Sequence, residues 1–219
     1  APEGVRVIDA AGRYVMPGVI DSHSHMGIDR GINEGSRSVV PEVRIADAIQ
    51  HDDPAFFTAL AGGITTIHTM HGSANSIGGQ NEVIKLKWGR PWEELVIDDA
   101  PITLKLALGE NVRRSSSDNP TRYPRSRSGV AEVMRESFQR ARNYMDAWER
   151  YEAEKAAWDR ANRRNRGLEP LPPKRDLQLE ALAGVLRGTT IIRCHAYRAD
   201  EMAMMMEVGT RESTLQDGA

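Results

Sequence analysis

Short apolar runs of strand length alternate with helical segments along most of this chain. Strands are predicted at 18–22, 64–70, 82–88, 101–108 and 189–197, and helices at 54–61, after Pro91, from 129 to about 164, at 174–188 and from 199 onward. Strands that alternate with helices favour a parallel α/β sheet or barrel. The helix at 54–61 has the clearest boundary signals, because Asp53 can cap it, Pro54 suits its first turn and Gly62 and Gly63 end it.

Composition excludes several classes of protein. The 219 residues carry 29 Lys and Arg against 31 Asp and Glu, a net charge of −2, so no overall field attracts nucleic acid or anionic membranes. No apolar stretch approaches the ~20 residues that span a bilayer. The single cysteine, Cys194, excludes an intramolecular disulfide and a Cys-based zinc cluster. We therefore predict a soluble chain with no nucleic-acid partner and no membrane span, in a cytoplasmic, periplasmic or otherwise exported location.

The middle of the chain departs from the alternating pattern. Residues 113–128 are rich in arginine and serine and are predicted to form a loop. Beyond it, one apolar face of a long helix is marked by residues at helical spacing, namely Met134, Phe138, Ala141, Met145 and Trp148. The far end of this helix is more polar and is expected to project beyond the core. We interpret 113–173 as an insertion.

The strongest chemical signal is His23-Ser24-His25, at the end of the first buried strand. Alternate residues of a strand share a face, so both imidazoles can hold one cation. An HxH pair is weak evidence by itself. Here it lies where a strand opens into a glycine-bearing loop, the position at which α/β barrels place their catalytic groups.

Four stretches together give the chain a family resemblance: VIDAAGRYVMPGVIDSHSHMG, GGITTIHTMHGSANSIGGQ, PITLKLALGEN and IIRCHAYRADEM. They resemble the metal-dependent amidohydrolase superfamily, and within it the imidazolonepropionase-like branch, over residues 4–111 and 173–218. The resemblance implies a TIM-type (β/α) barrel entered from a β-sandwich. It also implies hydrolysis of a C–N bond by a metal-activated water, with a divalent ion, zinc first, as cofactor in one or two copies.

The resemblance also implies a set of metal ligands. His23 and His25 match the first metal pair, and His195 matches the imidazole at the end of the fifth strand. Lys105 matches the lysine that several branches carboxylate with carbon dioxide, because a carbamate supplies the anion that an ammonium cannot. A charged lysine at a strand end is the simpler alternative for Lys105, and Glu110 is the alternative ligand.

Four further residues are candidate substrate contacts. His68 and His71 belong to the second strand and its following loop, where they could face the substrate, and Asn75 and Gln80 resemble positions near the substrate in this branch. The alternative is a half-buried structural histidine for His68 and His71, and a turn-stabilising amide for Asn75 and Gln80. The catalytic proton shuttle expected at strand eight has no counterpart here, so the catalytic residue is unknown. Asp217 stands where the family has a further histidine, and is a weaker candidate metal ligand.

We expect an incomplete barrel with about five of eight strands. Its predicted parts are a β-sandwich remnant and barrel entry (1–17), barrel strands one to four (18–112), the insertion (113–173), and strand five with the start of strand six (174–219). An open sheet edge exposes backbone and apolar surface, so a homo-oligomer or a partner chain completing the barrel is expected.

The predicted function is hydrolysis of a cyclic amide, an imidazolone-type ring or a dipeptide, by a chain that is incomplete or inactive alone. The alternative is a catalytically dead amidohydrolase that acts as an assembly or interaction subunit. The chain begins at Ala1, which suggests a piece of a longer protein.

Overall fold

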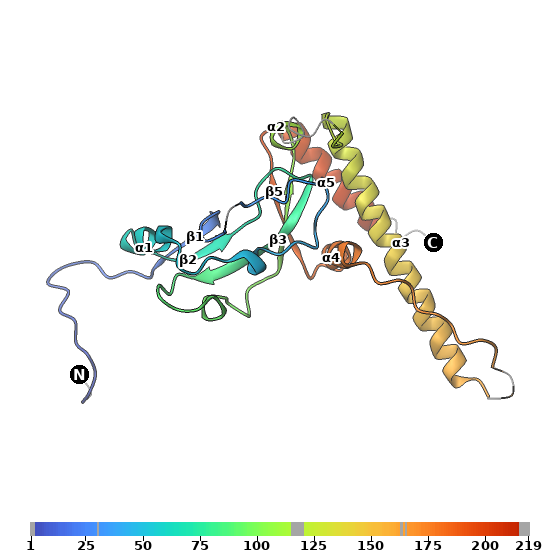
Figure 1. The fold of residues 1–219 in the computed structure, drawn as a ribbon, viewed down its shortest axis with the longest axis horizontal. Helices are drawn as coiled ribbons and strands as arrows, with labels where there is room; N and C mark the ends of the chain where they lie inside the picture. The colour runs from blue at the N-terminus through green and yellow to red at the C-terminus, as the bar shows by residue number, and fades with distance from the viewer. Residues whose placement is uncertain (1–2, 30, 115–120, 163, 165, 215–219) are drawn as a thin grey trace.

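The structure is a computed structural model that describes residues 3–29, 31–114, 121–162, 164 and 166–214. A curled five-stranded sheet lies at its centre (Figure 1). The strands are β1 (Val19–Ser24), β2 (Ile64–Thr69), β3 (Ile77–Lys85), β4 (Thr103–Ala107) and β5 (Ile191–His195). The helices are α1 (Pro54–Ala61), α2 (Glu110–Arg114), α3 (Arg127–Arg160), α4 (Leu177–Leu186) and α5 (Ala199–Thr214), together with the short 3-10 helices η1 (Ile45–Ala48) and η2 (Trp92–Glu94).

The strands follow one another across the sheet in chain order, but one of them runs against the rest. β1 pairs parallel with β2, and β4 pairs parallel with β5. β3 is antiparallel to both β2 and β4, so the prediction of an all-parallel sheet is wrong for this strand. The connection from β2 to β3, residues 70–76, is shorter than the dozen or so residues of a parallel crossover, and it can join only antiparallel neighbours.

The architecture is a mixed α/β half-barrel, with β1 and β5 as the two ends of the described sheet. β3 is antiparallel to both of its neighbours, β2 and β4, so β2 and β4 run in the same direction. β1 and β5 are parallel to them, and all four strands therefore point the same way. Their carboxyl ends therefore meet at one rim of the sheet.

Local sequence signals set the helix boundaries. The Asp53 side chain accepts a hydrogen bond from Ala55 N at the start of α1, and Gly63 leaves that helix with a φ of +90°. Ser126 caps α3 by accepting from Gly129 N, and Asp176 caps α4 by accepting from Gln178 N and Leu179 N. These caps supply partners for backbone donors that a helix cannot satisfy itself.

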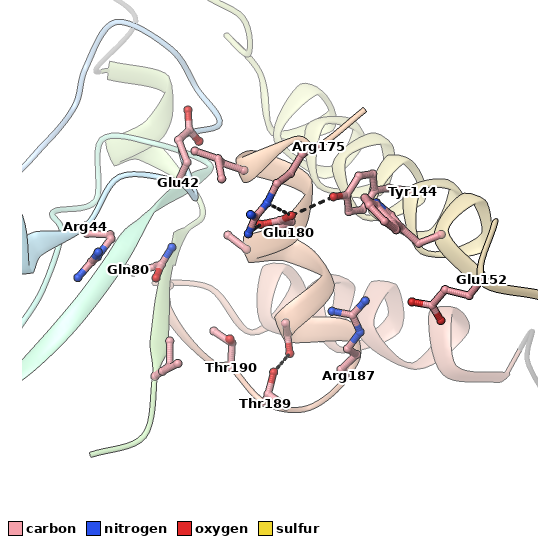
Figure 2. A pocket seen from close by; sticks show the side chains of 15 residues that line it. Glu42, Arg44, Gln80, Tyr144, Glu152, Arg175, Glu180, Arg187, Thr189 and Thr190 are labelled. Atoms are coloured by element: carbon pink, nitrogen blue, oxygen red, sulfur yellow. Dashed lines mark hydrogen bonds and ion pairs between the residues drawn. The ribbon is translucent and has the colours of Figure 1, made fainter. Parts of the chain in front are cut away.

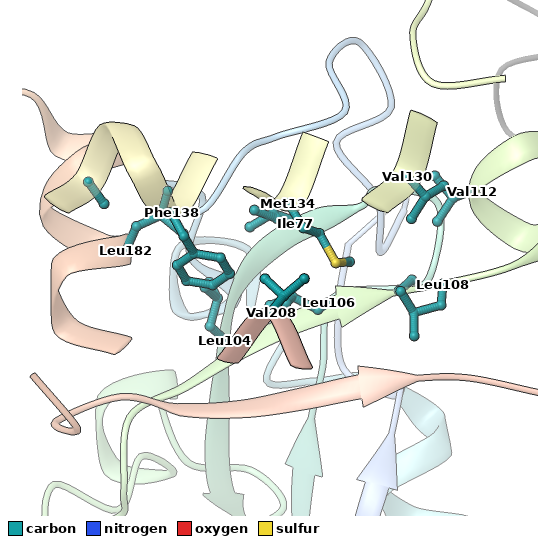
Figure 3. Close-up of a cluster of buried hydrophobic side chains, with 12 residues drawn as sticks. Ile77, Leu104, Leu106, Leu108, Val112, Val130, Met134, Phe138, Leu182 and Val208 are labelled. Atoms are coloured by element: carbon teal, nitrogen blue, oxygen red, sulfur yellow. The ribbon is translucent and has the colours of Figure 1, made fainter. Parts of the chain in front are cut away.

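The main core lies between the sheet and the helices α3, α4 and α5. Figure 3 shows Met134 and Phe138 of α3 facing Ile77 and Leu104 of the sheet, with Val130 of α3 beside Val112. A second cluster lies under α1 and consists of Phe56, Ala59, Ile67, Ile84, Leu86 and Leu95. The predicted apolar face of the long helix is therefore the face that packs on the sheet.

The long helix extends beyond this core. The buried residues of α3 all lie between Gly129 and Tyr144. Its remaining turns, to Arg160, run past the sheet as an arm (Figure 1). Trp158 on the arm lies between two cations, with Lys155 Nζ 4.9 Å and Arg166 Cζ 4.4 Å from its ring centre.

Several predicted elements differ from those observed. Residues 5–10, the expected β-sandwich strand, pair with no other strand among the described residues, and Val7 and Ile8 are exposed. The helix expected after Pro91 is only the 3-10 turn η2. The start of strand six expected within 174–219 does not occur up to Thr214, because α5 runs to that residue, and residues 215–219 lie outside the described part.

Candidate metal and substrate site

Two of the predicted metal ligands lie at the carboxyl-terminal rim of the half-barrel, and a third lies in the middle of a strand of the same sheet. His23 lies near the end of β1, Lys105 lies in β4, and His195 is the last residue of β5. In the register of β4 and β5, Lys105 is opposite Arg193 and Ala107 is opposite His195. Alternate residues of a strand share a face, so Lys105 and His195 are on the same side of the sheet.

His23 and His25 form a close pair. Their ring centres are 5.1 Å apart and the rings meet edge to face at 80°. His25 Nδ1 lies 2.9 Å from the carbonyl oxygen of Met70, which can only accept, so this nitrogen carries the proton. In the neutral ring, Nε2 of His25 is then left with its lone pair, as a metal ligand requires.

Lys105 is a buried amine beside this pair. Its side chain is 1% exposed, and its Nζ lies 3.4 Å from Nε2 of His23. Burial lowers the pKa of Lys105, and no described carboxylate forms an ion pair with it. The pKa of His23 is also lowered, first by burial and then by the nearby Lys105. Both groups are therefore biased toward their neutral forms.

His195 completes the set from the fifth strand. Its Nε2 atom is buried and has no hydrogen-bond partner among the described residues. The ring of Tyr197 packs edge to face on it, with centres 4.5 Å apart, and the Tyr197 hydroxyl donates to Asn111 Oδ1 at 3.1 Å. Burial, followed by Lys105, lowers the pKa of His195. An imidazole nitrogen that is buried without a partner is available to an external ligand.

One cavity of about 580 Å³ joins the three histidines. It is lined by His23, His25, Ile32, Asn33, Gly72, Ser73, Ala74, Asn111 and His195. A second cavity, of about 780 Å³, lies between the sheet, α3 and α4 (Figure 2). No histidine lines it, and Arg175 and Tyr144 both engage Glu180 there at 2.6 and 3.1 Å. The three histidines predicted as metal ligands therefore line the first cavity, which we call the histidine cavity.

The donors around the histidine cavity fit a divalent metal ion, with one condition. The unpartnered Nε2 of His195 and the oriented Nε2 of His25 are suitable ligands. However, His, Cys, Asp and Glu side chains alone form no group of three close enough to hold an ion within the described ranges. Lys105 is the remaining donor, and its ammonium form repels a cation. The set is complete only if Lys105 carries an anionic group.

The alternative ligands are placed elsewhere or are outside the described part. Glu110, at the start of α2, accepts hydrogen bonds from Arg113 at 2.7 Å and from Arg127 at 3.2 Å. It does not line the histidine cavity. Asp217 lies among residues 215–219, which the structure does not describe. Lys105 does not line this cavity either, but its Nζ lies 3.4 Å from His23 Nε2, whereas the Glu110 carboxylate is bound by two arginines. The geometry therefore favours Lys105 over Glu110.

The four predicted substrate residues do not line the histidine cavity. His71 donates from Nδ1 to Gly72 O at 2.9 Å and accepts at Nε2 from Glu34 N at 3.1 Å. His68 Nε2 lies 2.8 Å from Thr103 Oγ1. These contacts favour the structural alternative for both histidines, whose pKa values burial lowers.

The two amides are likewise engaged by the protein itself. Asn75 donates from Nδ2 to the carbonyl oxygens of Glu34 at 2.6 Å and Arg37 at 2.7 Å. Gln80 donates from Nε2 to Pro41 O at 3.0 Å, and it lines the cavity of Figure 2 instead. Both contacts fix the polar segment that follows β1, as the turn-stabilising alternative expects.

Four polar residues at the histidine cavity have no counterpart in the sequence-based predictions, namely Asn33, Ser73, Asn111 and Tyr197. Asn33 belongs to a polar loop with no periodicity, and Asn111 is the second residue of α2. Nothing in the local pattern distinguishes these residues from ordinary loop and helix-end residues. For Tyr197, its position two residues after His195 is the one feature of the sequence that could have indicated a place at the cavity.

Comparison with known proteins gives two relatives. No protein-family model matches the chain. A curated protein named amidohydrolase tasK, from Hapsidospora irregularis, is 31% identical over 228 residues, which cover 94% of this chain and 22% of the relative. The crystal structure of an amidohydrolase from Thermotoga maritima MSB8 superposes with a TM-score of 0.76 at 31% identity, covering 95% of this chain and 54% of that one.

Both relatives are named amidohydrolases, which supports an amidohydrolase family for this chain. The half-barrel matches part of the larger fold of the Thermotoga maritima protein. The chain spans about a fifth of one relative and about half of the other. The assignment to the imidazolonepropionase-like branch stays a prediction. Within the described residues, no helix combines the length and the apolar character needed to cross a bilayer.

Proposed function

We propose that this chain supplies the metal-binding half of an amidohydrolase barrel that hydrolyses a C–N bond. One observation carries the proposal. His23, His25 and His195 line a single cavity, and the buried amine of Lys105 lies 3.4 Å from His23. The two relatives named amidohydrolases support it independently.

The chain's own residues would prepare this site in two ways. Burial lowers the pKa values of His23 and His195, which keeps both rings neutral and able to act as ligands near pH 7. The carbonyl oxygen of Met70 orients His25 through Nδ1, as outer-shell partners of metal-binding histidines generally do.

Lys105 would contribute the missing negative charge. Burial lowers its pKa and so increases the fraction of free amine. The amine lone pair attacks the carbon of carbon dioxide, an N–C bond forms as one C=O π bond opens, and a proton leaves to solvent. The product is a carbamate with two oxygens in place of a cation.

His23, His25, His195 and carboxylated Lys105 would hold one or two divalent ions, zinc being the first expectation. Such an ion lowers the pKa of a water and polarises the scissile carbonyl of the substrate. The substrate class we propose is a cyclic amide or imidazolone-type ring, or a dipeptide. The alternative of a catalytically dead assembly subunit stays a prediction, as do a homo-oligomer and a partner chain that completes the barrel.

Metal analysis combined with hydrolysis assays tests the proposal. A protein in which this chain is part of a complete barrel should bind zinc and hydrolyse a member of a panel of imidazolones, cyclic amides and dipeptides. The His23→Ala/His25→Ala protein should lose both zinc and hydrolysis. His51→Ala is the matched control, because His51 is exposed and lies away from the cavity. Unchanged zinc content and turnover in the double variant would contradict the proposal.

A further inference from the structure

Ile32 and Asn33 line the histidine cavity and belong to the polar segment 31–38, which hydrogen bonds hold in place. Gly72 N donates to Ile32 O at 2.8 Å, and Glu34 N donates to His71 Nε2 at 3.1 Å. Asn75 holds the same segment through its two hydrogen bonds to carbonyl oxygens. The buried Arg122 links this segment to the 72–74 backbone, because it donates hydrogen bonds to Ser38 Oγ at 3.2 Å and to Ala74 O at 2.7 Å.

Asn33 is the cavity-lining residue of this segment whose side chain remains able to bind a ligand. Its Oδ1 accepts a hydrogen bond from Ala74 N at 3.2 Å. A backbone N–H can only donate, so this contact fixes which end of the amide is oxygen. The Nδ2 group then carries two N–H donors with no protein partner among the described residues. Asn33 is exposed and lines the histidine cavity.

Gly72 makes this placement possible. A Cβ atom built at Gly72 would lie 2.4 Å from Asn33 Oδ1 and 2.7 Å from its Nδ2. Any larger residue at position 72 would therefore displace the Asn33 amide from the 72–74 backbone. The φ of Gly72 is not in the left-handed region, so the need for glycine here comes from the close approach of Asn33 and not from the backbone.

We propose that Asn33 is a specificity-determining residue that contacts the substrate. Its Nδ2 donates a hydrogen bond to a carbonyl or carboxylate oxygen of a molecule bound in the histidine cavity. A neutral amide held in place by the backbone supplies a donor with a fixed direction and little entropy to lose on binding. The inference rests on the proposed function, because it assumes that the substrate occupies this cavity.

Two variants remove the donor by different routes. Asn33→Asp keeps an oxygen for Ala74 N but replaces the donor by a second oxygen. Gly72→Ala leaves Asn33 intact and displaces it. Both should raise the KM of the hydrolysed substrate about tenfold or more, with a much smaller change in kcat, as expected for loss of one hydrogen bond to a charged or strongly polar group.

The matched controls are Asn143→Asp on α3 and Gly167→Ala, where an added Cβ meets nothing within 4 Å. Neither should change KM. Thermal unfolding of each variant shows that it is folded before its kinetics are compared. A wild-type KM in folded Asn33→Asp, or in folded Gly72→Ala, would overturn the inference.

A second readout does not depend on turnover. N-acetylglycine carries both an amide carbonyl and a carboxylate, and it is titrated into the ¹⁵N-labelled protein at the highest soluble concentration. The side-chain amide signals of Asn33, identified by their absence in Asn33→Asp, should shift with a saturable dependence. Signals that do not move overturn the inference.

The two proposals fail in different ways. Shifted Asn33 signals without hydrolysis of any C–N substrate would contradict the proposed function and leave this contact standing. Hydrolysis with an unchanged KM in the variants would contradict the contact and leave the function standing.

Discussion

Lys105 Nζ lies 3.4 Å from His23 Nε2, although 82 positions separate the two residues in the chain. An ammonium group beside an imidazole, with no described carboxylate to balance it, is an unfavourable place for a charged lysine. Burial accordingly lowers the pKa of Lys105. A modification that turns the amine into an anion would remove this unfavourable charge and make Lys105 able to bind a cation.

The first prediction concerns Lys105. Lys105→Ala should lower zinc content and reduce hydrolysis strongly, because the carbamate that would help to hold the metal is lost. Added acetate or propionate should restore part of the turnover by occupying the vacated position. Lys105→Arg should not respond, since a guanidinium stays cationic at any usable pH. Zinc per chain and rates with and without acetate measure these effects.

The control for this prediction is Glu110→Gln. Glu110 accepts from Arg113 and Arg127 and lies outside the histidine cavity, so its substitution should leave zinc content unchanged. Full zinc and near-normal activity in Lys105→Ala, together with zinc loss in Glu110→Gln, would transfer the ligand role to Glu110.

The second prediction concerns the buried contacts around Thr103. Its hydroxyl lies 2.8 Å from His68 Nε2 and accepts from Asn81 Nδ2 at 2.8 Å. Thr103→Val keeps the shape and leaves the Nε2 atom of His68 and the Nδ2 atom of Asn81 buried without this partner, which should cost about 1–3 kcal/mol of unfolding free energy. Thr65→Val, at an exposed position of β2, should change it by less than about 0.5 kcal/mol. Urea denaturation compares the two, and equal stabilities would refute the argument.

The third prediction concerns Arg127, which links α3 to two other helices. Its guanidinium lies 3.2 Å from Glu110 Oε1 and 3.2 Å from Glu201 Oε1. Glu201 is only 7% exposed, so Arg127→Met leaves a buried carboxylate without its cation. Because Arg127 itself is partly exposed, we expect a loss of about 1–3 kcal/mol, below the value for a fully buried pair.

A double variant separates charge from packing at this position. Glu201→Gln in the Arg127→Met background should recover part of the lost stability, because the unpaired charge is removed. Arg135→Met is the matched control, since its ion pair with Glu132 is long, at 4.0 Å, and exposed. If the double variant is no more stable than Arg127→Met, the loss comes from packing and not from charge.

The fourth prediction concerns acid stability. Burial lowers the pKa values of His23, His68, His71 and His195 below their ordinary value of 6.5. Below pH 6.5 the unfolded chain therefore binds more protons at these histidines than the folded chain does. Their contribution to the free energy of unfolding is complete above pH 6.5 and is lost as the pH falls from 6.5 through the lowered pKa values. Burial raises the pKa of Glu82, which acts in the opposite direction.

Denaturation of metal-free protein between pH 7.5 and pH 5 measures this loss. His71→Gln should be less stable at pH 7.5, but its free energy of unfolding should depend less steeply on pH. The reason is that the variant lacks one histidine whose pKa is lowered in the folded state. The exposed His51 provides the comparison, and His51→Gln should keep the wild-type slope. A His71→Gln slope equal to that of the wild type would show that His71 is not one of the groups responsible.

Most strands and helices could be predicted from the sequence, because periodicity and caps are local. Asp53 and Pro54 begin α1 as expected, and α3 packs through its predicted apolar face. The direction of β3 could not be read from its own residues, because it follows from the length of the 70–76 connection. Residues 5–10 alternate as a strand should, but a strand also needs a neighbour to pair with.

The candidate site divides in the same way. His23 and His195 could be placed because each lies at or near the end of a parallel strand, and Lys105 because it lies within the apolar run that forms β4. His68 and His71 share the strand-end position, but only the tertiary contacts show that their ring nitrogens are occupied by protein groups. Asn33 could not be predicted as a cavity residue from its local sequence, because a long-range hydrogen bond brings it to the cavity.

The reversed direction of β3 has a consequence for evolution and for engineering. A strand that runs backwards presents its amino-terminal end at the rim of the histidine cavity, so the chain after Lys85 emerges at the opposite end of the sheet. The connection 86–102 is thereby separated from the chemistry, and its turn at Gly89 has a φ of +81° with open space around it. Length changes, affinity tags or fluorescent reporters inserted near Gly89 should therefore be tolerated where the same insertions in 70–76 would not.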